Sequence, residues 1–257
     1  MTRRVAIANQ KGGVGKTTTS VNLAASLTLH GANTLLVDLD PQGNATMGCG
    51  VDKHALPLSM YDWLVGDAQL AEVVVTGASG MELAPSNLDL TAAEIELLGS
   101  ADRNARLRAR LDRDAERFDY VIMDCPPSLS VLTLNALMAA DGVLIPLQCE
   151  YYALEGLTAL LDTIAGVRSR GNPGLSIEGI VRTMYDPRTG LTRDVSRQLM
   201  KHFGDRVFRT VIPRNVRLAE APSHGLPAIL YDRHCAGATC YMALARELMG
   251  RATVQRP

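Results

Sequence analysis

A glycine-rich segment that carries two lysines is the clearest chemical signal in this chain. Residues 10–19 read QKGGVGKTTT. Glycines allow several backbone N–H groups to point at one anion, and a helix that starts here adds its partial positive charge. We therefore predict a phosphate-binding loop. The residues expected to contact phosphate are Lys11, Gly12, Gly13, Val14, Gly15, Lys16, Thr17 and Thr18.

Two apolar runs that end in aspartate are the second signal. Residues 33–38 read NTLLVD, with Asp40 two positions later, and residues 120–124 read YVIMD. Carboxylates at the carboxyl ends of parallel strands lie beside a ligand bound at that edge of the sheet. Asp124 has the form of an acid that holds magnesium through water. The segment after Asp38 could instead be a turn closed by Asx hydrogen bonds.

The elements that would position these residues alternate along the chain. The run 5–8 predicts a strand, and the apolar spacing over 21–27 predicts a helix. Further strands are expected over 33–38, 81–85, 120–124, 143–147, 177–184 and from 211, and further helices over 61–65, 69–74, 87–98, 102–118, 131–140, 153–170, 191–203 and 237–250. This alternation predicts an α/β fold with a mostly parallel twisted sheet flanked by helices.

The composition is that of a globular protein, with 47% hydrophobic and 21% charged residues. Because no Pro/Gly/Ser-rich linker divides residues 1–257, we expect one domain, with 251–257 as a flexible tail. No apolar run approaches the roughly 18 residues of a membrane span, which favours a cytoplasmic protein. The cysteines form no C-x-x-C pair, so reduced thiols are expected rather than disulfides or a metal site. They are Cys49, Cys125, Cys149, Cys235 and Cys240.

The charge is uneven along the chain. Residues 182–217 hold nine basic and three acidic residues, a local balance of +6, whereas the whole chain has a net charge of −1. In the expected helix 191–203, Leu191, Val195, Leu199 and Phe203 share one face, and Arg193, Arg197 and Lys201 share the opposite face. A solvated stripe is the ordinary explanation of such a face, and binding of DNA phosphates is the functional one.

Several segments together resemble one protein family. The loop lacks the usual glycine at position 10 and has a second lysine, Lys11, so that it resembles the deviant Walker A motif of the ParA/MinD ATPases. The segments DLDPQGN at 38–44, QCEYYALEGL at 148–157 and IPRNVRL at 212–218 also resemble chromosomal, Soj-type ParA proteins. The resemblance implies a P-loop ATPase that uses ATP/ADP and Mg²⁺.

The resemblance also implies roles for single residues. It assigns Lys16 to the phosphates, Lys11 to the phosphates of a facing subunit, and Asp40 to the attacking water, so these three are the expected catalytic residues. Thr17 and Asp124 would hold magnesium, with Asp38 nearby. Pro213 and Asn215 would border the adenine, although Asn215 could equally stabilise a turn.

For partners, the resemblance implies an ATP-dependent homodimer, nonspecific double-stranded DNA and a ParB-like centromere-binding protein. Arg188 and Arg217 are the implied DNA contacts, together with Arg193, Arg197 and Lys201. The protein would then be nucleoid-associated, and its cargo could be a chromosome or a plasmid. A membrane-surface ATPase of the MinD type is the alternative, but the polar end of the chain lacks a cationic amphipathic tail. Residues 231–240 depart from the family pattern.

Overall fold

The chain folds around one sheet whose strand order differs from the sequence order. The computed structural model describes the backbone of residues 2–254 and the side chains of residues 2–251. Over this range the strands are β1 Arg3–Ile7, β2 Thr34–Asp38, β3 Val75–Thr76, β4 Glu82–Ala84, β5 Tyr120–Asp124, β6 Gly142–Gln148, β7 Ser176–Tyr185 and β8 Val207–Pro213. Their order across the sheet is β3-β4-β2-β5-β1-β6-β7-β8. All neighbours pair parallel except β3, which runs antiparallel to β4.

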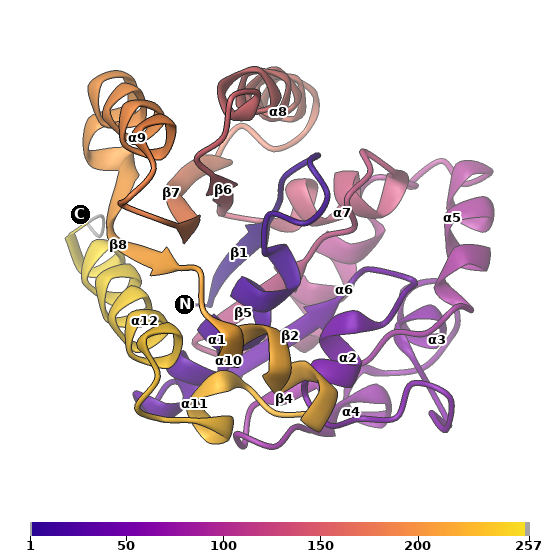
Figure 1. Cartoon of the computed structure of the whole chain (residues 1–257). Helices are drawn as coiled ribbons and strands as arrows, with labels where there is room; N and C mark the ends of the chain where they lie inside the picture. The colour runs from indigo at the N-terminus through magenta and orange to yellow at the C-terminus, as the bar shows by residue number, and fades with distance from the viewer. Residues whose placement is uncertain (1, 255–257) are drawn as a thin grey trace.

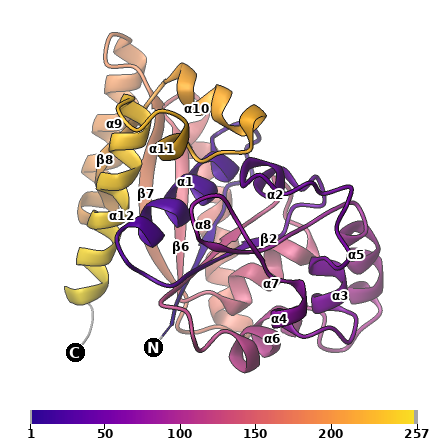
Figure 2. The same cartoon turned by 90° about the horizontal axis from the view of Figure 1, so that it is seen from below.

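Helices cover both faces of this sheet (Figure 1). They are α1 Lys16–Leu29, α2 Asn44–Gly48, α3 Met60–Leu64, α4 Leu70–Val73, α5 Leu90–Leu98, α6 Arg106–Asp114, α7 Val131–Ala139, α8 Ala153–Arg170, α9 Gly190–Phe203, α10 Val216–Glu220, α11 Ala228–Tyr231 and α12 Ala236–Val254, with 3₁₀ turns η1 Gly204–Arg206 and η2 Ala221–His224. One core includes α3 to α9, and the other includes α1, α2 and α10 to α12 (Figure 2). The predicted fold class, a mostly parallel sheet flanked by helices, is confirmed.

Successive side chains along each strand pack alternately in the two cores. Val5 and Ile7 of β1 pack in the core under α1 and α12, whereas Ala6 packs in the other core. Leu35 and Leu36 of β2 divide in the same way. Because successive side chains of a strand point to opposite faces, a strand buried on both faces needs an unbroken apolar run. This requirement explains the apolar runs in the sequence.

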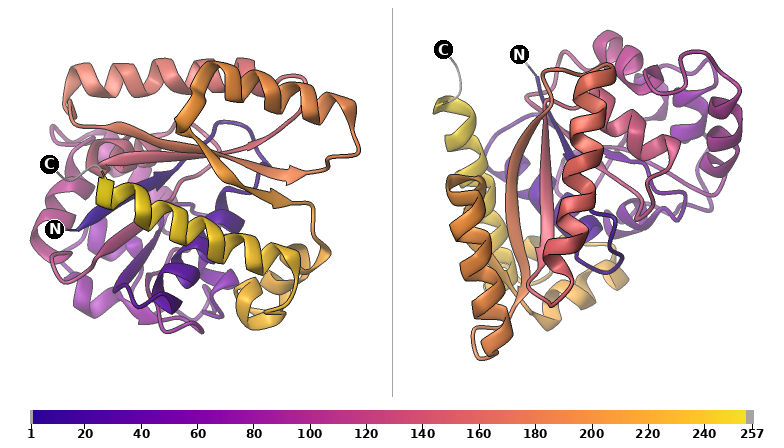
Figure 3. Two further views of the ribbon diagram at one scale, coloured as in Figure 1. Left: turned by 90° about the vertical axis from the view of Figure 1, so that its left-hand side faces the viewer. Right: turned by 90° about the horizontal axis from the view of Figure 1, so that it is seen from above.

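The strand order fixes where a ligand can bind. The connection from β1 leads past β5 to β2, whereas the connection from β6 leads away to β7 on the other side. Ligands of open parallel sheets bind at the carboxyl edge where connections diverge in this way. Helices α8 and α9 lie side by side along the β6–β8 half of the sheet (Figure 3). The loop after β1 therefore begins at the ligand-binding edge.

Some elements differ from those expected. The short elements α2, β3, α10 and α11 were not predicted, and α6 spans 106–114 rather than 102–118. Strand β8 begins at residue 207 rather than 211. Helix α12 continues to Val254, beyond its expected end at 250, so residues 251–254 are helical. The rest of the expected flexible tail, 255–257, lies outside the described residues.

Candidate nucleotide-binding site

The glycine loop is held in shape by its own backbone and by two neighbouring strands. Gly13 and Gly15 adopt left-handed conformations, with φ of 72° and 88°, which disfavour any side chain. The hydroxyl of Thr183, at the end of β7, donates to the carbonyl of Val14 at 2.8 Å. The amide of Asn9 donates to the carbonyl of Pro146 in β6, also at 2.8 Å. The loop is thus tied to β6 and β7.

Lys16 opens α1 beneath the loop. Its side chain is buried, and Nζ donates to the carbonyl of Lys11 across the loop at 3.1 Å. Burial lowers the pKa of Lys16, and the nearby charges of Asp124 and Asp40 act against that shift. A buried ammonium at a helix N-terminus is placed to bind an anion.

Asp38 and Asp124 are fully buried at the ends of adjacent strands. Oδ2 of Asp38 accepts from the backbone N–H and the hydroxyl of Thr46, at 2.8 and 2.7 Å. Oδ1 of Asp124 accepts from Ser20 Oγ at 2.7 Å, whereas Oδ2 of Asp124 has no hydrogen-bond partner among the described residues. Burial raises the pKa of both carboxyls, and the charge of Asp38 raises the pKa of Asp124 further.

This arrangement fits a magnesium ion. An orphaned, buried carboxylate oxygen beside a second buried acid is a costly arrangement that a cation relieves. The hydroxyl of Thr17 lies close enough to Asp124 to act against this rise in the pKa of the carboxyl. Over the described residues there is no cluster of three or more His, Cys, Asp or Glu side chains that could enclose a metal. Magnesium needs no such enclosure, because it is commonly held by one or two carboxylates together with water and phosphate oxygens.

Asp40 lies in a tight turn beyond β2. Its backbone N–H donates to Asp38 Oδ1 at 3.2 Å, and its own Oδ1 accepts from the backbone N–H of Gln42 at 2.9 Å. The Asx turn considered from the sequence is therefore present. Oδ2 takes no part in that turn and makes no hydrogen bond within the part of the chain that the structure describes. The side chain is only 8% exposed, so a water molecule bound to it would be shielded from bulk solvent.

Lys11 lies apart from this cluster. Its Nζ pairs with Glu150 Oε2 at 2.6 Å, and both side chains are more than two-fifths exposed. Its backbone remains part of the phosphate loop, where its N–H donates to Asn9 Oδ1 at 3.0 Å and its carbonyl accepts from Lys16. The structure thus brings Lys16, Asp38, Asp40 and Asp124 together and leaves the Lys11 ammonium at the surface.

Pro213 ends β8 and Asn215 lies two residues later, at the same edge of the sheet. Pro213 is the register partner of Tyr185 in β7. Oδ1 of Asn215 accepts from the N–H groups of Arg217 and Leu218, at 2.9 and 3.3 Å, and so caps α10. The stabilising role considered for Asn215 is confirmed, whereas its contact with adenine stays a prediction.

The expected basic face forms on α9. Arg193, Arg197 and Lys201 are exposed, while Val195 and Leu199 are buried on the opposite face. Leu191 departs from the expected apolar face, because it is 45% exposed at the first turn of the helix, beyond the sheet.

One of the nine basic residues counted from the sequence is structural. Arg182 is buried in β7, where its guanidinium donates to Ser196 Oγ at 2.9 Å and to the Phe208 carbonyl at 3.0 Å. The surface charge of this region is therefore smaller than the sequence count of its basic residues indicates.

Arg188 and Arg217 are each paired with acids. Arg188 forms a two-pronged contact with Asp186, at 2.9 and 2.7 Å, which lowers the pKa of Asp186 to about 2. Arg217 contacts Glu220 at 2.8 Å and Asp232 at 3.4 Å. Exposed pairs of this kind contribute only about 0–1 kcal/mol, so phosphates can compete for these cations.

Sequence reasoning missed the residues that support the site. Thr183, Ser20, Thr46 and Glu150 were not predicted, although each contacts a predicted residue. A possible signal was available for Thr183, because it lies near the carboxyl end of a predicted strand, as Asp38 and Asp124 do. That signal points to the loop only once the strand order is known, because the strand order places β7 next to β6 and so brings Thr183 to the loop.

None of the helices over residues 2–254 has the length and apolar character needed to cross a bilayer.

Comparisons with known proteins agree with this geometry. A family model described as an AAA domain matches residues 2–177. The sporulation initiation inhibitor protein Soj of Bacillus subtilis strain 168 is 51% identical over 249 residues, which cover 96% of this chain and 98% of Soj.

A second relative and one solved structure extend the comparison. The chromosome partitioning protein ParA of Caulobacter vibrioides strain NA1000 is 50% identical over 252 residues, which cover 97% of this chain and 94% of that protein. Among solved structures, cobyrinic acid a,c-diamide synthase from Mycobacterium smegmatis, with bound ADP and magnesium, is similar with a TM-score of 0.88 and 41% identity over 100% of this chain and 97% of that one. Together with the glycine loop and its buried acids, these similarities show that the chain belongs to the ParA/Soj family of chromosome-partitioning ATPases.

Proposed function

We propose that this protein is a DNA-partitioning ATPase whose ATP state controls dimerisation and binding to nonspecific DNA. The main support is the cluster of Lys16, Asp38 and Asp124 beneath the glycine loop. There a buried ammonium that can bind an anion lies near a carboxylate oxygen of Asp124 that has no hydrogen-bond partner among the described residues. A triphosphate with a divalent cation satisfies both groups. The names of two relatives, a chromosome partitioning protein from Caulobacter vibrioides and a chromosome-partitioning ATPase from Treponema pallidum, support the same function.

The phosphate site acts by placing charge rather than by covalent chemistry. Lys16 and the loop N–H groups would hold the β- and γ-phosphates, and Thr17 and Asp124 would hold the magnesium ion, Asp124 through water. Asp38, fixed by Thr46, would lie just outside. Bound Mg²⁺ would neutralise phosphate charge. Phosphoryl transfer depends mainly on such positioning and electrostatic stabilisation.

Asp40 would orient the attacking water. Its free Oδ2 can accept a hydrogen bond from a water molecule, while Oδ1 keeps the side chain fixed in the turn. Attack on the γ-phosphorus breaks the bond to the β–γ bridging oxygen and gives ADP, phosphate and a proton. The buried position of Asp40 excludes competing solvent.

Lys11 would act across a two-fold interface. Its pair with Glu150 is exposed and therefore weak, so the ammonium can exchange this partner for the phosphates of a facing subunit. Exposed apolar side chains lie on two loops at the nucleotide edge. Leu129, in the loop after β5, is 46% exposed, and Tyr151 and Tyr152, in the loop after β6, are 76% and 68% exposed. Such a patch is typical of an interaction surface. ATP would then bridge a homodimer, and hydrolysis would release it.

Dimerisation would combine two basic faces. Arg193, Arg197 and Lys201 on α9 would contact DNA phosphates, and Arg188 and Arg217 would join after exchanging their acidic partners. Doubling the number of phosphate contacts steepens the salt dependence of binding, so the dimer would hold DNA far more tightly than the monomer. A ParB-like partner would stimulate hydrolysis and so end the bound state.

The test is the ATPase rate of the full chain, alone, with nonspecific DNA, and with DNA and a ParB-like protein. We expect a slow basal rate that rises only when DNA and the partner are both present. A rate that responds instead to anionic liposomes, with ATP-dependent co-sedimentation, would replace the proposal with the membrane-surface alternative.

A further inference from the structure

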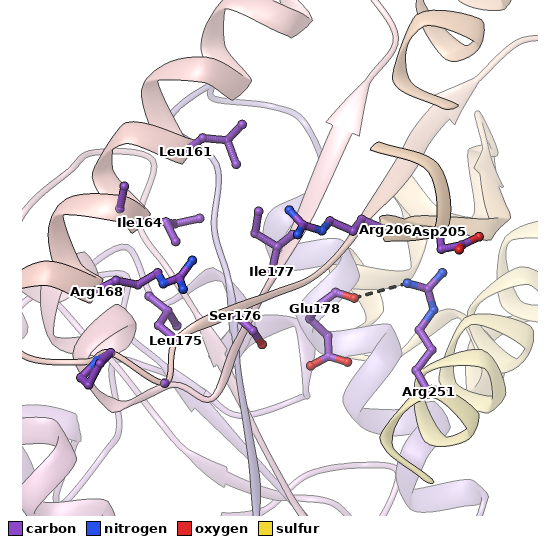
Figure 4. A pocket seen from close by; sticks show the side chains of 13 residues that line it. Leu161, Ile164, Arg168, Leu175, Ser176, Ile177, Glu178, Asp205, Arg206 and Arg251 are labelled. Atoms are coloured by element: carbon purple, nitrogen blue, oxygen red, sulfur yellow. Dashed lines mark hydrogen bonds between the residues drawn. The ribbon is translucent and has the colours of Figure 1, made fainter. Parts of the chain in front are cut away.

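A hollow of about 500 Å³ lies at the edge of the sheet opposite the phosphate loop (Figure 4). The carboxyl-terminal half of α8, residues 173–178 at the start of β7, and η1 form its walls. Parallel strands place all their carboxyl ends at the nucleotide edge, so a hollow at the amino end of β7 is remote from the nucleotide site. We refer to it as the α8–η1 hollow.

The floor of the α8–η1 hollow is apolar. It consists of Leu161 and Ile164 from α8, Leu175 from the preceding turn and Ile177 from β7. Ile164 and Leu175 are 3% and 1% exposed, and the other two pack against the same core as partly buried residues. The floor is therefore apolar and continuous with the core, and it can receive an apolar group.

Two arginines reach over this floor from opposite walls. Arg168 comes from the last turn of α8 and Arg206 from η1, and their guanidinium groups extend toward each other (Figure 4). Both residues are exposed, and neither guanidinium has a hydrogen bond or ion pair with any residue whose side chain the structure describes. The hollow thus presents two cations that the fold itself does not use.

The other charged residues of the α8–η1 hollow are accounted for. Arg251 donates to Glu247 at 3.0 Å and lies over the ring of Phe208 at 4.0 Å. Oε2 of Glu178 is bound by Arg3 at 2.5 Å, and Oε1 of Glu178 has no hydrogen-bond partner among the described residues. Asp205 points away from the two guanidinium groups (Figure 4). Hence no acid of the hollow neutralises Arg168 or Arg206.

The convergence of these arginines is the informative feature. A cation in the last turn of a helix complements the helix dipole, which explains Arg168 alone. It does not explain why a second guanidinium from another element extends into the same space, since like charges repel. An anion between them would convert this repulsion into two charge-assisted contacts, and the guanidinium group suits carboxylate and phosphate geometry.

We propose that the α8–η1 hollow binds a small organic anion with an apolar body. The anionic head, a carboxylate or a phosphate monoester, would lie between Arg168 and Arg206, and the apolar body would lie on the floor near Ile164. The volume lies within the roughly 300–1,000 Å³ of typical small-ligand sites. The site is independent of the proposed DNA and nucleotide functions, because it shares none of their residues.

Octanoate is a suitable probe, because it combines a carboxylate with an eight-carbon body. Titration of the nucleotide-free full chain, followed by calorimetry and by the NMR signals of the Leu and Ile methyl groups, should show one saturable site. Arg168→Gln and Arg206→Gln should each weaken binding at least tenfold. Arg170→Gln is the matched control, because Arg170 is also exposed at the end of α8 but does not line the hollow. Its affinity should equal that of the wild type.

Two further ligands separate the parts of the site. Acetate has the head without the body, and octylamine has the same body with the opposite charge, so both should bind much more weakly than octanoate. Equal binding of octanoate and octylamine, or unchanged binding in both Gln variants, would overturn the proposal. So would displacement of octanoate by a DNA duplex, because the two arginines would then belong to the DNA surface. Unchanged melting temperatures and ATP affinity would confirm that the variants fold.

Discussion

Asp38 and Asp124 stand opposite each other in the adjacent parallel strands β2 and β5, and both are fully buried. Two ionised carboxylates so placed repel each other, and burial disfavours the charge of each. The two carboxylates thus destabilise the folded chain at the edge of the sheet where the glycine loop, the buried Lys16 and Asp40 also lie. A bound cation would therefore stabilise the folded chain here, because it would offset the charges of both carboxylates.

The first prediction concerns stability and pH. A carboxyl whose pKa is raised by folding binds more protons in the folded state, so the free energy of unfolding falls as pH rises from about 4, where an ordinary aspartate ionises, toward neutrality. Asp124→Asn removes this penalty. The nucleotide-free variant should be more stable than the wild type at pH 7.5 by on the order of 1 kcal/mol, or about 2–4 °C in Tm.

At pH 5.5 the difference between Asp124→Asn and the wild type should shrink, since protonation removes the charge from the wild-type carboxyl. Thermal melts at the two pH values measure both effects. Added Mg²⁺ and ADP should stabilise the wild type much more than the variant. A variant that is less stable than the wild type at pH 7.5 would show that Asp124 is not strained in the empty site.

The second prediction concerns the anchor of the loop. Thr183→Val keeps the shape of the side chain but leaves the Val14 carbonyl without its 2.8 Å hydrogen bond. Losing such a buried bond costs about 1–3 kcal/mol, and we expect the affinity for a fluorescent ATP analogue to fall at least fivefold. Thr183→Ser retains the hydroxyl and should bind nearly as the wild type does. If Val and Ser variants bind equally well, the hydrogen bond does not shape the loop.

The third prediction concerns the surface lysine. Glu150→Gln should free the Lys11 ammonium from its 2.6 Å ion pair and so strengthen ATP-dependent dimerisation, by at most about fivefold because exposed pairs contribute about 0–1 kcal/mol. Lys11→Ala should abolish it. Analytical ultracentrifugation with a nonhydrolysable ATP analogue measures both constants. A weaker dimer in Glu150→Gln would mean that the carboxylate itself lies in the interface.

The fourth prediction concerns DNA. Arg188→Glu or Arg217→Glu should abolish retention on nonspecific DNA and leave nucleotide binding intact. Asp186→Asn, which releases Arg188 from its acidic partner, should have the opposite effect and raise DNA affinity at low salt. Filter binding over a salt series distinguishes the cases. Retention of DNA by both Glu variants would remove these arginines from the DNA face.

The parts of the site that sequence could predict are those encoded locally. The glycine pattern with its helix start, and each apolar run with the aspartate at its end, are signals that span only a few residues, so the loop, Asp38, Asp40 and Asp124 could be recognised before the strand order was known. The alternation of apolar runs and helical spacing was sufficient for the fold class in the same way.

The parts that could not be predicted depend on distant contacts. Thr183 and Val14 are 169 positions apart, and Lys11 and Glu150 are 139 apart, so only the strand order brings them together. The burial of Arg182 was equally hidden, since a charge count does not distinguish a solvated guanidinium from one that bonds to backbone carbonyls. The short elements α2 and β3 have too few residues to show a period.

The most direct test of the ATP switch is gel filtration of two variants with ATP and Mg²⁺. Asp40→Ala should bind ATP without hydrolysing it and elute as a stable dimer, because the water-orienting carboxylate is lost while the phosphate contacts remain. Lys16→Ala should elute as a monomer, because the phosphates lose their buried cation. If the two variants elute alike, the roles assigned to Asp40 and Lys16 are wrong.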